Sequence, residues 1–427
     1  MSVHAIRFAL AASLFWAANA CAIVFTVDST EEGIDDDLFN TTCHTSTGHC
    51  TLRAAVMQAN HIVNEDSTIE VPAGTYILGA AIDNDDERSG DLNLITPASG
   101  NPVITINGAG SARTFIVGNG SDRILSVANG RTSEIQNITF TGGKATLGDG
   151  GAIQNSGVLT VSNAVVEKSS ADYCGGGIGN DNQLGIYNST ISENVAIFGA
   201  GLCSNAASGL TVVRSAIVRN LGNHGGGIRN YGTAIVINST VAENATLTDG
   251  GGIENYGSAV IGVYNSTIVR NSANSSRDFY SGGGISNITG GTFNLRNSVV
   301  AGNTLSSNTD GDYAPVYNDC WGTFSLYGRN AFYADPCTFT YVEPTSLAYL
   351  VPFSELGPLH YNGGPTQTIA LLPPSSMIDG AMTTCVNQNN QTLPTDQRGK
   401  PRTIGAYCDI GAFEYDPDEV FIDGFDG

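Results

Sequence analysis

Basic residues are scarce in this sequence. Its 427 residues include 18 lysines and arginines against 40 aspartates and glutamates, a formal net charge of −22 at pH 7. Lysine occurs only as Lys144, Lys168 and Lys400. Nucleic acids and anionic membranes are polyanions, which an acidic surface repels. The composition therefore excludes both as expected partners.

Long apolar runs are also missing after the N-terminus, since no later segment approaches the roughly 18 residues of a membrane-spanning helix. Arg7, an apolar stretch over 8–18 and the small residues of 18–22 are instead typical of a secretory signal peptide. We expect residues 1–22 to be removed, with cleavage after Ala20 or Ala22. Lipidation of Cys21 is the alternative, although the preceding Ala-Asn-Ala is a poor lipobox. The mature chain is expected to be secreted or displayed on the outer cell surface.

Glycine, by contrast, is abundant, and its 53 residues include a fixed period. A glycine with an asparagine four residues later returns every 25 residues, at Gly151, Gly176, Gly201, Gly226 and Gly251, and resumes at Gly283 after an insertion. Between these positions, short runs of Val, Ile and Thr alternate with Gly and Asn, which is typical of short strands and tight turns. A constant period of this length is typical of a solenoid. We predict an all-β, right-handed parallel β-helix of about ten rungs over residues 68–312.

Equivalent positions of successive rungs should stack about 4.8 Å apart. The alignment predicts three columns: an inward apolar column, an asparagine ladder and a line of charges of alternating sign on the surface. The apolar column comprises Ile153, Ile178, Ile228, Ile253 and Ile285, interrupted once by Cys203. The asparagine ladder comprises Asn155, Asn180, Asn205, Asn230, Asn255 and Asn287. The charged line comprises Lys168, Glu193, Arg219, Glu243 and Arg270. Repeated Asn-x-Ser/Thr triplets match glycosylation sequons, but a ladder explains them without any sugar.

The segment before the first strand is the one clear amphipathic helix, over Leu52–Asn60, with Thr51 placed as its N-cap. A β-helix needs such an element to cover its open apolar end. Residues 23–67 are therefore expected to form an N-terminal cap.

Two end motifs resemble known families. Cys43-x6-Cys50-Thr51-Leu52-Arg53-Ala54-Ala55, followed by Gln58-Ala59-Asn60, is similar to the CSLREA motif at the start of bacterial surface β-helix proteins, with Ala54 in place of the usual Glu. Over 313–415, Asn362-Gly363-Gly364-Pro365, Asp396-Gln397-Arg398-Gly399 and Cys408-Asp409-Ile410-Gly411 resemble the region called choice-of-anchor Q. The resemblance implies a pectate-lyase-like β-helix that is exported and displayed, with no established reaction. The acidic tail 416–427 is either a sorting signal or a disordered end.

Eight cysteines remain after the signal peptide, and they fall into neighbouring pairs. An even number in an exported chain predicts disulfides. The pairs are Cys43/Cys50, Cys174/Cys203, Cys320/Cys337 and Cys385/Cys408. A metal site at Cys43-His44-x4-His49-Cys50 is the alternative for the first pair.

Candidate site residues are few. Tyr231 and Tyr256 share one column and could form a sugar-binding platform. His224 and Asp249 share a turn column, either as an acid–base dyad or as a simple turn contact. The insertion at 272–281 carries Arg277, Asp278, Phe279 and Tyr280. The carboxylates that could supply the pair required for glycoside hydrolysis are Asp149, Asp181, Asp249 and Glu254.

No cofactor is required by these patterns. Two acidic strings, Glu31-Glu32-x2-Asp35-Asp36-Asp37 and Asp83-x-Asp85-Asp86-Glu87, could bind Ca²⁺ weakly, or they could be solvated loops. We expect a non-catalytic, adhesin-like or envelope-associated protein that binds extracellular glycans or other surfaces. The alternative is an extracellular lyase or hydrolase acting on an acidic polysaccharide. The sequence leaves the oligomeric state open.

Overall fold

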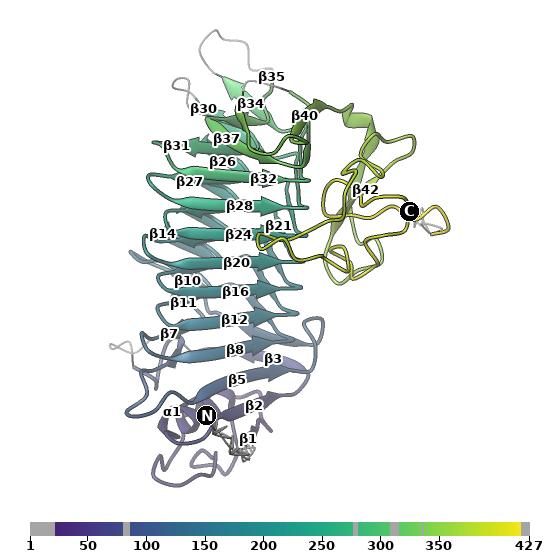
Figure 1. Cartoon of the computed structure of the whole chain (residues 1–427). Helices are drawn as coiled ribbons and strands as arrows, with labels where there is room; N and C mark the ends of the chain where they lie inside the picture. Colours follow the sequence, from purple (N-terminus) through teal and green to yellow (C-terminus); the bar gives the residue numbers. More distant parts are fainter. Residues whose placement is uncertain (1–21, 80–85, 276–280, 308–315, 335–336, 420–427) are drawn as a thin grey trace, which may run out of the picture.

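A tall parallel β-helix dominates the computed structural model, which describes residues 22–79, 86–275, 281–307, 316–334 and 337–419 (Figure 1). Each rung contributes one strand to each of four sheets, which we call A, B, D and C in chain order. One rung consists of β12 (Val158–Ser162), β13 (Val165–Glu167), β14 (Ser170–Cys174) and β15 (Ile178–Asn180). This confirms the prediction of a mainly β, parallel β-helix.

Sheets A and B form two long faces, with 12 and 11 strands in the described residues. Sheet A runs through β1 (Ile23–Thr26), β2 (Ser67–Val71), β5 (Val103–Gly108), β8 (Thr132–Gln136), β12, β16 (Gln183–Tyr187), β20 (Gly209–Val213), β24 (Thr233–Ile237), β28 (Val260–Tyr264), β32 (Thr292–Arg296), β37 (Thr323–Tyr327) and β39 (Thr338–Tyr341). Sheet B runs through β3 (Gly74–Ile77), β6 (Thr114–Val117), β9 (Thr139–Thr141), β13, β17 (Thr190–Ser192), β21 (Ala216–Val218), β25 (Thr240–Ala242), β29 (Thr267–Val269), β33 (Val299–Ala301), β38 (Arg329–Phe332) and β40 (Leu347–Leu350). Strands of both sheets therefore continue beyond residue 312, where we expected the solenoid to end.

Sheets C and D are shorter. Sheet C contains β4 (Leu92–Leu94), β7 (Leu125–Val127), β11 (Ile153–Asn155), β15, β19 (Leu202–Ser204), β23 (Ile228–Asn230), β27 (Ile253–Tyr256), β31 (Ile285–Ile288) and β36 (Cys320–Trp321). Sheet D contains β10 (Lys144–Ala145), β14, β18 (Val195–Phe198), β22 (Leu221–His224), β26 (Ala245–Asp249), β30 (Ser272–Ser275), β34 (Thr304–Ser307) and β35 (Val316–Tyr317). Only β35 pairs antiparallel in this sheet, with β34, among the described residues.

The inward apolar column is present, with one correction. Leu202, not Cys203, pairs with Ile178 on one side and Ile228 on the other. The prediction assumed a constant spacing, but the ladder advances by 24 residues into β19 and then by 26 into β23. Leu202 therefore fills the core, and the outward Cys203 is free to bond Cys174.

The same shift changes the first asparagine ladder. Asn155 donates to Asn180 at 2.8 Å, as predicted, but Asn180 donates to Ser204, so Ser204 stands where Asn205 was expected. A second, deeper ladder joins Asn194, Asn220, Asn244, Asn271 and Asn303 by side-chain bonds of 2.9–3.0 Å and ends at Asp319. Since buried amides must find partners, these ladders account for the repeated asparagines. Asn238 and Asn265 of the sequon triplets are buried, which supports the structural interpretation.

The charged line occupies one turn of every rung, and its five residues all have φ between 51° and 57°. One close ion pair forms between neighbours, Arg219 with Glu243 at 2.9 Å. Lys168 pairs instead with the adjacent Glu167, and Arg270 donates to the carbonyl of Gly357. Glu193 and Arg219 line one pocket, so they lie on the same face. The line is thus a shared turn position with one interstrand ion pair, rather than a continuous ion ladder.

The N-terminal end is covered by α1 (Leu52–His61), whose cap Thr51 accepts a hydrogen bond from the Ala54 amide. Nine of its ten residues are buried, including Arg53, which pairs with Glu32 at 2.6 Å. The helix is held from both sides, against the first rungs and beneath the segment that precedes it. The predicted cap helix is therefore present.

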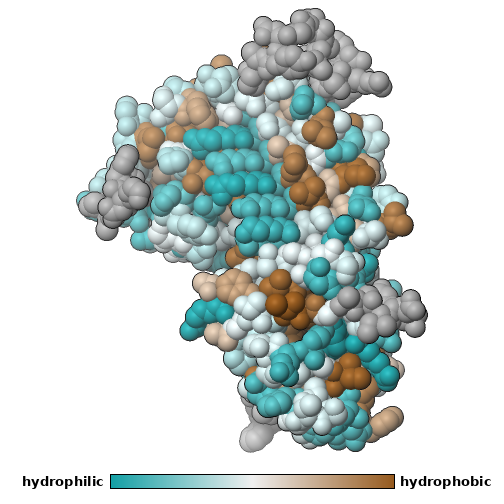
Figure 2. All heavy atoms as spheres, turned by 180° about the vertical axis from the view of Figure 1, so that it is seen from behind, coloured by the Kyte–Doolittle hydropathy of each residue, from teal (hydrophilic) through white to brown (hydrophobic). Residues whose placement is uncertain are grey.

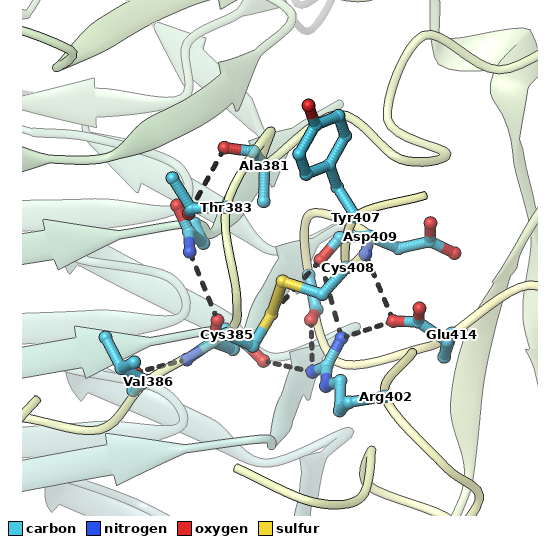
Figure 3. Close-up of a disulfide and its surroundings, with 12 residues drawn as sticks. Ala381, Thr383, Cys385, Val386, Arg402, Tyr407, Cys408, Asp409 and Glu414 are labelled. Carbon is cyan, nitrogen blue, oxygen red and sulfur yellow. Dashed lines mark hydrogen bonds and ion pairs between the residues drawn. A yellow bond between two sulfur atoms is a disulfide. The ribbon is translucent and has the colours of Figure 1, made fainter. Parts of the chain in front are cut away.

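The C-terminal region returns along the side of the solenoid and packs against the middle of sheet B (Figure 1). It contains the short 3₁₀ helix Phe353–Glu355 and a hairpin of β41 (Leu356–His360) and β42 (Thr368–Leu371). The buried Arg402 joins the two parts: its Nη2 donates to Asn238 of the solenoid at 2.7 Å, and its Nη1 lies 3.3 Å from Glu414 (Figure 3). The Cys385–Cys408 disulfide closes the loop beside it (Figure 3).

All four cysteine pairs predicted from the sequence are disulfides in the structure. The metal alternative at Cys43 and Cys50 therefore does not hold for this structure, because both thiols are bonded to each other. Cys21 and the signal-peptide segment lie outside the described residues. The described part of the chain has no helix long and apolar enough to cross a membrane.

The third disulfide, between Cys320 and Cys337, requires a correction of its place in the fold. We expected both cysteines in the C-terminal region at 313–415, but Cys320 lies in β36 of sheet C, and Cys337 directly precedes β39 of sheet A. Cys320 is buried in the solenoid core, whereas Cys337 is only half-buried and packs against that core. The bond therefore belongs to the last rungs of the solenoid. The sequence did not place it there because the 25-residue period ends before these rungs.

Candidate functional site at the corner of sheets D and C

Glycine turns bring the ends of the sheet D strands over the outer face of sheet C. Gly225 and Gly250 both have φ near 60°, and a Cβ at either would lie 2.8 Å from the Cβ of Arg229 or Glu254, respectively. Only glycine permits this approach. The result is a corner at which two columns of side chains face each other, one from the sheet D ends and one from sheet C.

The two columns form what we call the corner cluster, seven residues from four consecutive rungs. From sheet D come Phe198, His224 and Asp249, which pair in register. From sheet C and the residues that follow its strands come Arg229, Tyr231, Glu254 and Tyr256. The Cys174–Cys203 disulfide joins the same two columns one rung earlier and braces the corner.

A buried ion pair lies at the centre of the corner cluster. Arg229 Nη2 is 3.3 Å from Glu254 Oε1, and their side chains are only 6% and 1% exposed. Neither Glu254 oxygen accepts a hydrogen bond, and Arg229 Nε and Nη1 donate none. Burial raises the pKa of the Glu254 carboxyl to about 7, with Arg229 and His224 opposing the shift. An incompletely hydrogen-bonded buried pair is costly for stability, and perturbed carboxyls of this kind gather at functional sites.

Three aromatic rings surround the Arg229 guanidinium. Its Cζ lies 4.5 Å from the Phe198 ring centroid, 4.9 Å from that of Tyr231 and 5.1 Å from that of Tyr256. The two tyrosine rings are 5.7 Å apart at an interplanar angle of 67°. Tyr231 and Tyr256 are thus neighbours, but they form an angled pair rather than one flat platform. Tyr256 is 38% exposed and supplies the open edge of the cluster.

His224 and Asp249 are brought together, although not as a tight dyad. His224 Nδ1 lies 3.7 Å from Asp249 Oδ2 and shares a shorter hydrogen bond of 2.8 Å with Thr248 Oγ1. The His224 ring also stacks on Phe198 with centroids 5.4 Å apart. These contacts hold the imidazole against the aromatic wall.

The other two candidate carboxylates lie on the preceding rungs and already have partners. Asp149 accepts the Cys174 amide at 2.9 Å, and burial raises the pKa of its carboxyl. Asp181 accepts from Gln154 at 2.7 Å and from Asn205 at 2.6 Å. Of the four carboxylates, Asp249 and Glu254 therefore share the corner cluster, and Asp149 and Asp181 form a separate group.

The described residues contain no group of three or more His, Cys, Asp or Glu placed to hold a metal ion. In the first acidic string, Glu32 pairs with Arg53, and Asp35 accepts hydrogen bonds from the His44 amide and from Gln58. In the second, Glu87 pairs with His61, while Asp83 and Asp85 lie outside the described residues. The insertion residues Arg277, Asp278, Phe279 and Tyr280 also lie outside them.

Sequence reasoning missed Arg229 and Phe198. The signal was present at the outward position of sheet C, which holds Gln154, Gly179, Cys203, Arg229, Glu254 and Ser286 on successive rungs. This position varies while its flanking Ile and Asn positions repeat. Variation inside a constant frame marks the positions that the ladder does not need.

No protein-family model matches the chain, and no curated protein matches it. The resemblance to CSLREA and choice-of-anchor Q proteins rests on the motifs alone. Among solved structures, the pectate lyase Pel9A aligns over 91% of this chain and 97% of its own, with 14% identity and a TM-score of 0.51. The A-module of the mannuronan C-5 epimerase AlgE6 of Azotobacter vinelandii aligns over 75% and 97%, with 15% identity and a TM-score of 0.25. At these identities the pectate lyase shows the fold alone, a β-helix shared with polysaccharide-acting enzymes, and the epimerase module carries no argument.

Proposed function

We propose that this protein is an exported, non-catalytic β-helix protein, adhesin-like or envelope-associated, that binds extracellular glycans at the corner cluster. One observation carries the proposal: an angled pair of tyrosines, one of them exposed, stands over a buried charged pair on a rigid corner. Sugars present apolar C–H faces to aromatic rings and hydroxyls to neighbouring polar groups. Four disulfides support an oxidising, extracellular setting.

Burial of Glu254 favours binding over catalysis. A general acid or base must come within about 3 Å of the proton that it transfers. At 1% exposure, the Glu254 carboxyl lies beneath the rings rather than at the surface where a polysaccharide would sit. Its role in this proposal is to hold the Arg229 guanidinium in place below the tyrosines.

The test is binding of the whole secreted chain to a glycan array. Tyr231→Ala and Tyr256→Ala should each weaken binding, whereas Tyr341→Ala should not, because Tyr341 is an exposed tyrosine at the far end of the solenoid. Binding that is unchanged in both corner variants would overturn the proposal.

A polysaccharide lyase or hydrolase is the second candidate. It is favoured by the near-neutral pKa of Glu254 beside Asp249 and His224. Release of reducing sugar or unsaturated uronate from a panel of acidic polysaccharides would establish it, provided that Glu254→Gln abolishes the release.

A further inference from the structure

The outer face of sheet B changes character along the solenoid. Beneath the C-terminal region its residues are small, apolar and buried, as at Ala216, Val218, Ala242, Val269 and Val299. On the preceding rungs, β13 and β17 present Val165, Glu167, Thr190 and Ser192 at the same positions. The apolar face therefore ends where its covering ends, and a face with hydroxyl and carboxylate groups begins.

A groove lies at this boundary, between the hydroxyl-bearing part of sheet B and the C-terminal region. Two adjoining pockets of about 210 and 260 Å³ form it, and both are lined by Val165, Thr190 and Tyr361. One extends to Ser111 and Pro365, the other to Phe115, Ser192, Arg219 and Gln367. We call this the sheet B groove. It spans rungs β6 to β17, so strands spaced about 4.8 Å apart form its floor.

Tyr361 is the aromatic wall of the groove. It comes from the C-terminal region, lines both pockets and is 55% exposed. The opposite wall and floor belong to the β-helix, whose backbone is fixed by the ladder bonds. A ligand would therefore meet an accessible ring across a rigid strand surface.

The polar groups of the groove are suited to an uncharged ligand. Within the described residues, no protein group hydrogen-bonds to the hydroxyls of Thr190 or Ser192 on the floor. Arg219 is already engaged, with Glu243 at 2.9 Å and with Gln367 Oε1 at 3.4 Å. Glu167 and Glu193 add negative charge to the lining. A polyanion would be repelled by this lining and by the net charge of the chain, whereas sugar hydroxyls could bond to the free groups.

We propose that the sheet B groove is a second glycan site, which binds an uncharged linear oligosaccharide along the solenoid, with a sugar face against Tyr361 and hydroxyls bonded to Thr190 and Ser192. The proposal rests on the proposed function only in the class of ligand. Residues, elements and location differ from those of the corner cluster. Bands of hydrophilic residues that run across successive rungs, with apolar residues in separate patches, are visible on the rear face (Figure 2).

The experiment titrates the mature chain with cellohexaose, xylohexaose and maltohexaose, with hexagalacturonate as the acidic comparison, using calorimetry and hydrogen exchange. We expect at least one neutral hexasaccharide to bind and to protect residues 188–193 and 361–367. Tyr361→Ala should weaken that binding about fivefold to tenfold, as expected for loss of one aromatic contact. Thr190→Val, which removes one hydroxyl without changing the side-chain shape, should weaken it less. Tyr407→Ala is the matched control, an exposed tyrosine of the same region that does not line the groove.

The outcomes separate this inference from the proposed function. If Tyr231→Ala weakens binding while Tyr361→Ala and Thr190→Val bind as the parent chain does, the groove proposal is overturned and the corner stands. If the reverse holds, the corner proposal fails and the groove stands. Preference for hexagalacturonate overturns the uncharged ligand class, and absence of binding by the parent chain overturns both sites.

Discussion

Arg229 and Glu254 lie opposite each other on adjacent strands of sheet C, with Nη2 and Oε1 3.3 Å apart and both side chains buried. Their position is outward with respect to the solenoid, yet the glycine turns of sheet D and three aromatic rings cover them. A charged pair is thus buried on the outside of the ladder, where the fold itself does not require it. This relationship makes the corner testable by pH.

Glu254→Gln should change how stability depends on pH. The folded-state pKa of Glu254 is raised to about 7 from its ordinary value of 4.5. Because the raised value means that the folded state holds the proton more tightly, its stabilising effect is full below about pH 4.5 and is lost as pH rises to about 7. Across that window we expect the parent chain to lose on the order of 3 kcal/mol relative to Glu254→Gln.

The measurement is chemical denaturation of both chains from pH 4 to pH 8.5. Asp319, Asp409 and Glu414 also have raised pKa values, so the difference between the two curves, not the parent curve alone, reports on Glu254. Parallel curves across the whole range would contradict a buried, proton-retaining Glu254.

Removal of the corner disulfide should affect binding as well as stability. Cys174→Ser with Cys203→Ser opens a loop with a sequence separation of 29 residues, and about 2–4 kcal/mol of stability should be lost. Cys385→Ser with Cys408→Ser is the matched control, because its separation of 23 residues is similar and it lies in the C-terminal region. Thermal unfolding should show comparable losses, whereas glycan-array binding at the corner should fall only in the first variant. Equal binding by both variants would show that the disulfide does not position the corner.

The sequence predicted the ladder well because a ladder is a local and repeated constraint. Positions that stack must be compatible with themselves, so Ile, Asn and Gly recur and can be counted along the chain. The same regularity misled the alignment at Cys203, since one shorter turn before β19 moves Leu202 inward without changing the glycine pattern. A one-residue shift reverses which side chains face the core. Where the period stops, as before Cys320 and Cys337, the last rungs could not be recognised from the sequence.

The site could be predicted only in part. Tyr231 and Tyr256 share a column, so they were found, and their angle of 67° depends on Arg229 packing between and below them. The sheet B groove could not be found, because it forms between Tyr361 and strands 171 to 246 residues earlier in the chain, from Phe115 to Thr190. Sequence periodicity carries no information on where a distant region will dock.

Asn244→Ala should be strongly destabilising. The buried Asn244 side chain donates to Asn271 at 2.9 Å and to the Ile217 carbonyl at 2.8 Å, and its oxygen accepts from Asn220. Alanine would leave these buried groups without partners, at about 1–3 kcal/mol each. The matched control is Asn294→Ala on the outer face of β32, which should change stability by less than about 0.5 kcal/mol. Denaturant unfolding of the two variants checks the contrast, and similar losses would mean that the ladder amides contribute no more than a surface asparagine.

Arg402→Met should loosen the C-terminal region from sheet B. The substitution keeps an apolar stem of similar length but removes the donor to Asn238 and leaves the Glu414 carboxyl buried without its cation. Breaking a buried pair in this way costs about 3–5 kcal/mol. Burial and Asp409 already raise the pKa of Glu414 to about 8, so loss of Arg402 should raise it further and extend the pH range over which ionisation destabilises the chain. Adding Glu414→Gln to Arg402→Met should recover part of the loss, because no buried charge then remains. Limited proteolysis and hydrogen exchange of residues 352–419 measure the docking directly. If the single and double variants release this region equally, the bond to Asn238 rather than the buried pair holds the two parts together.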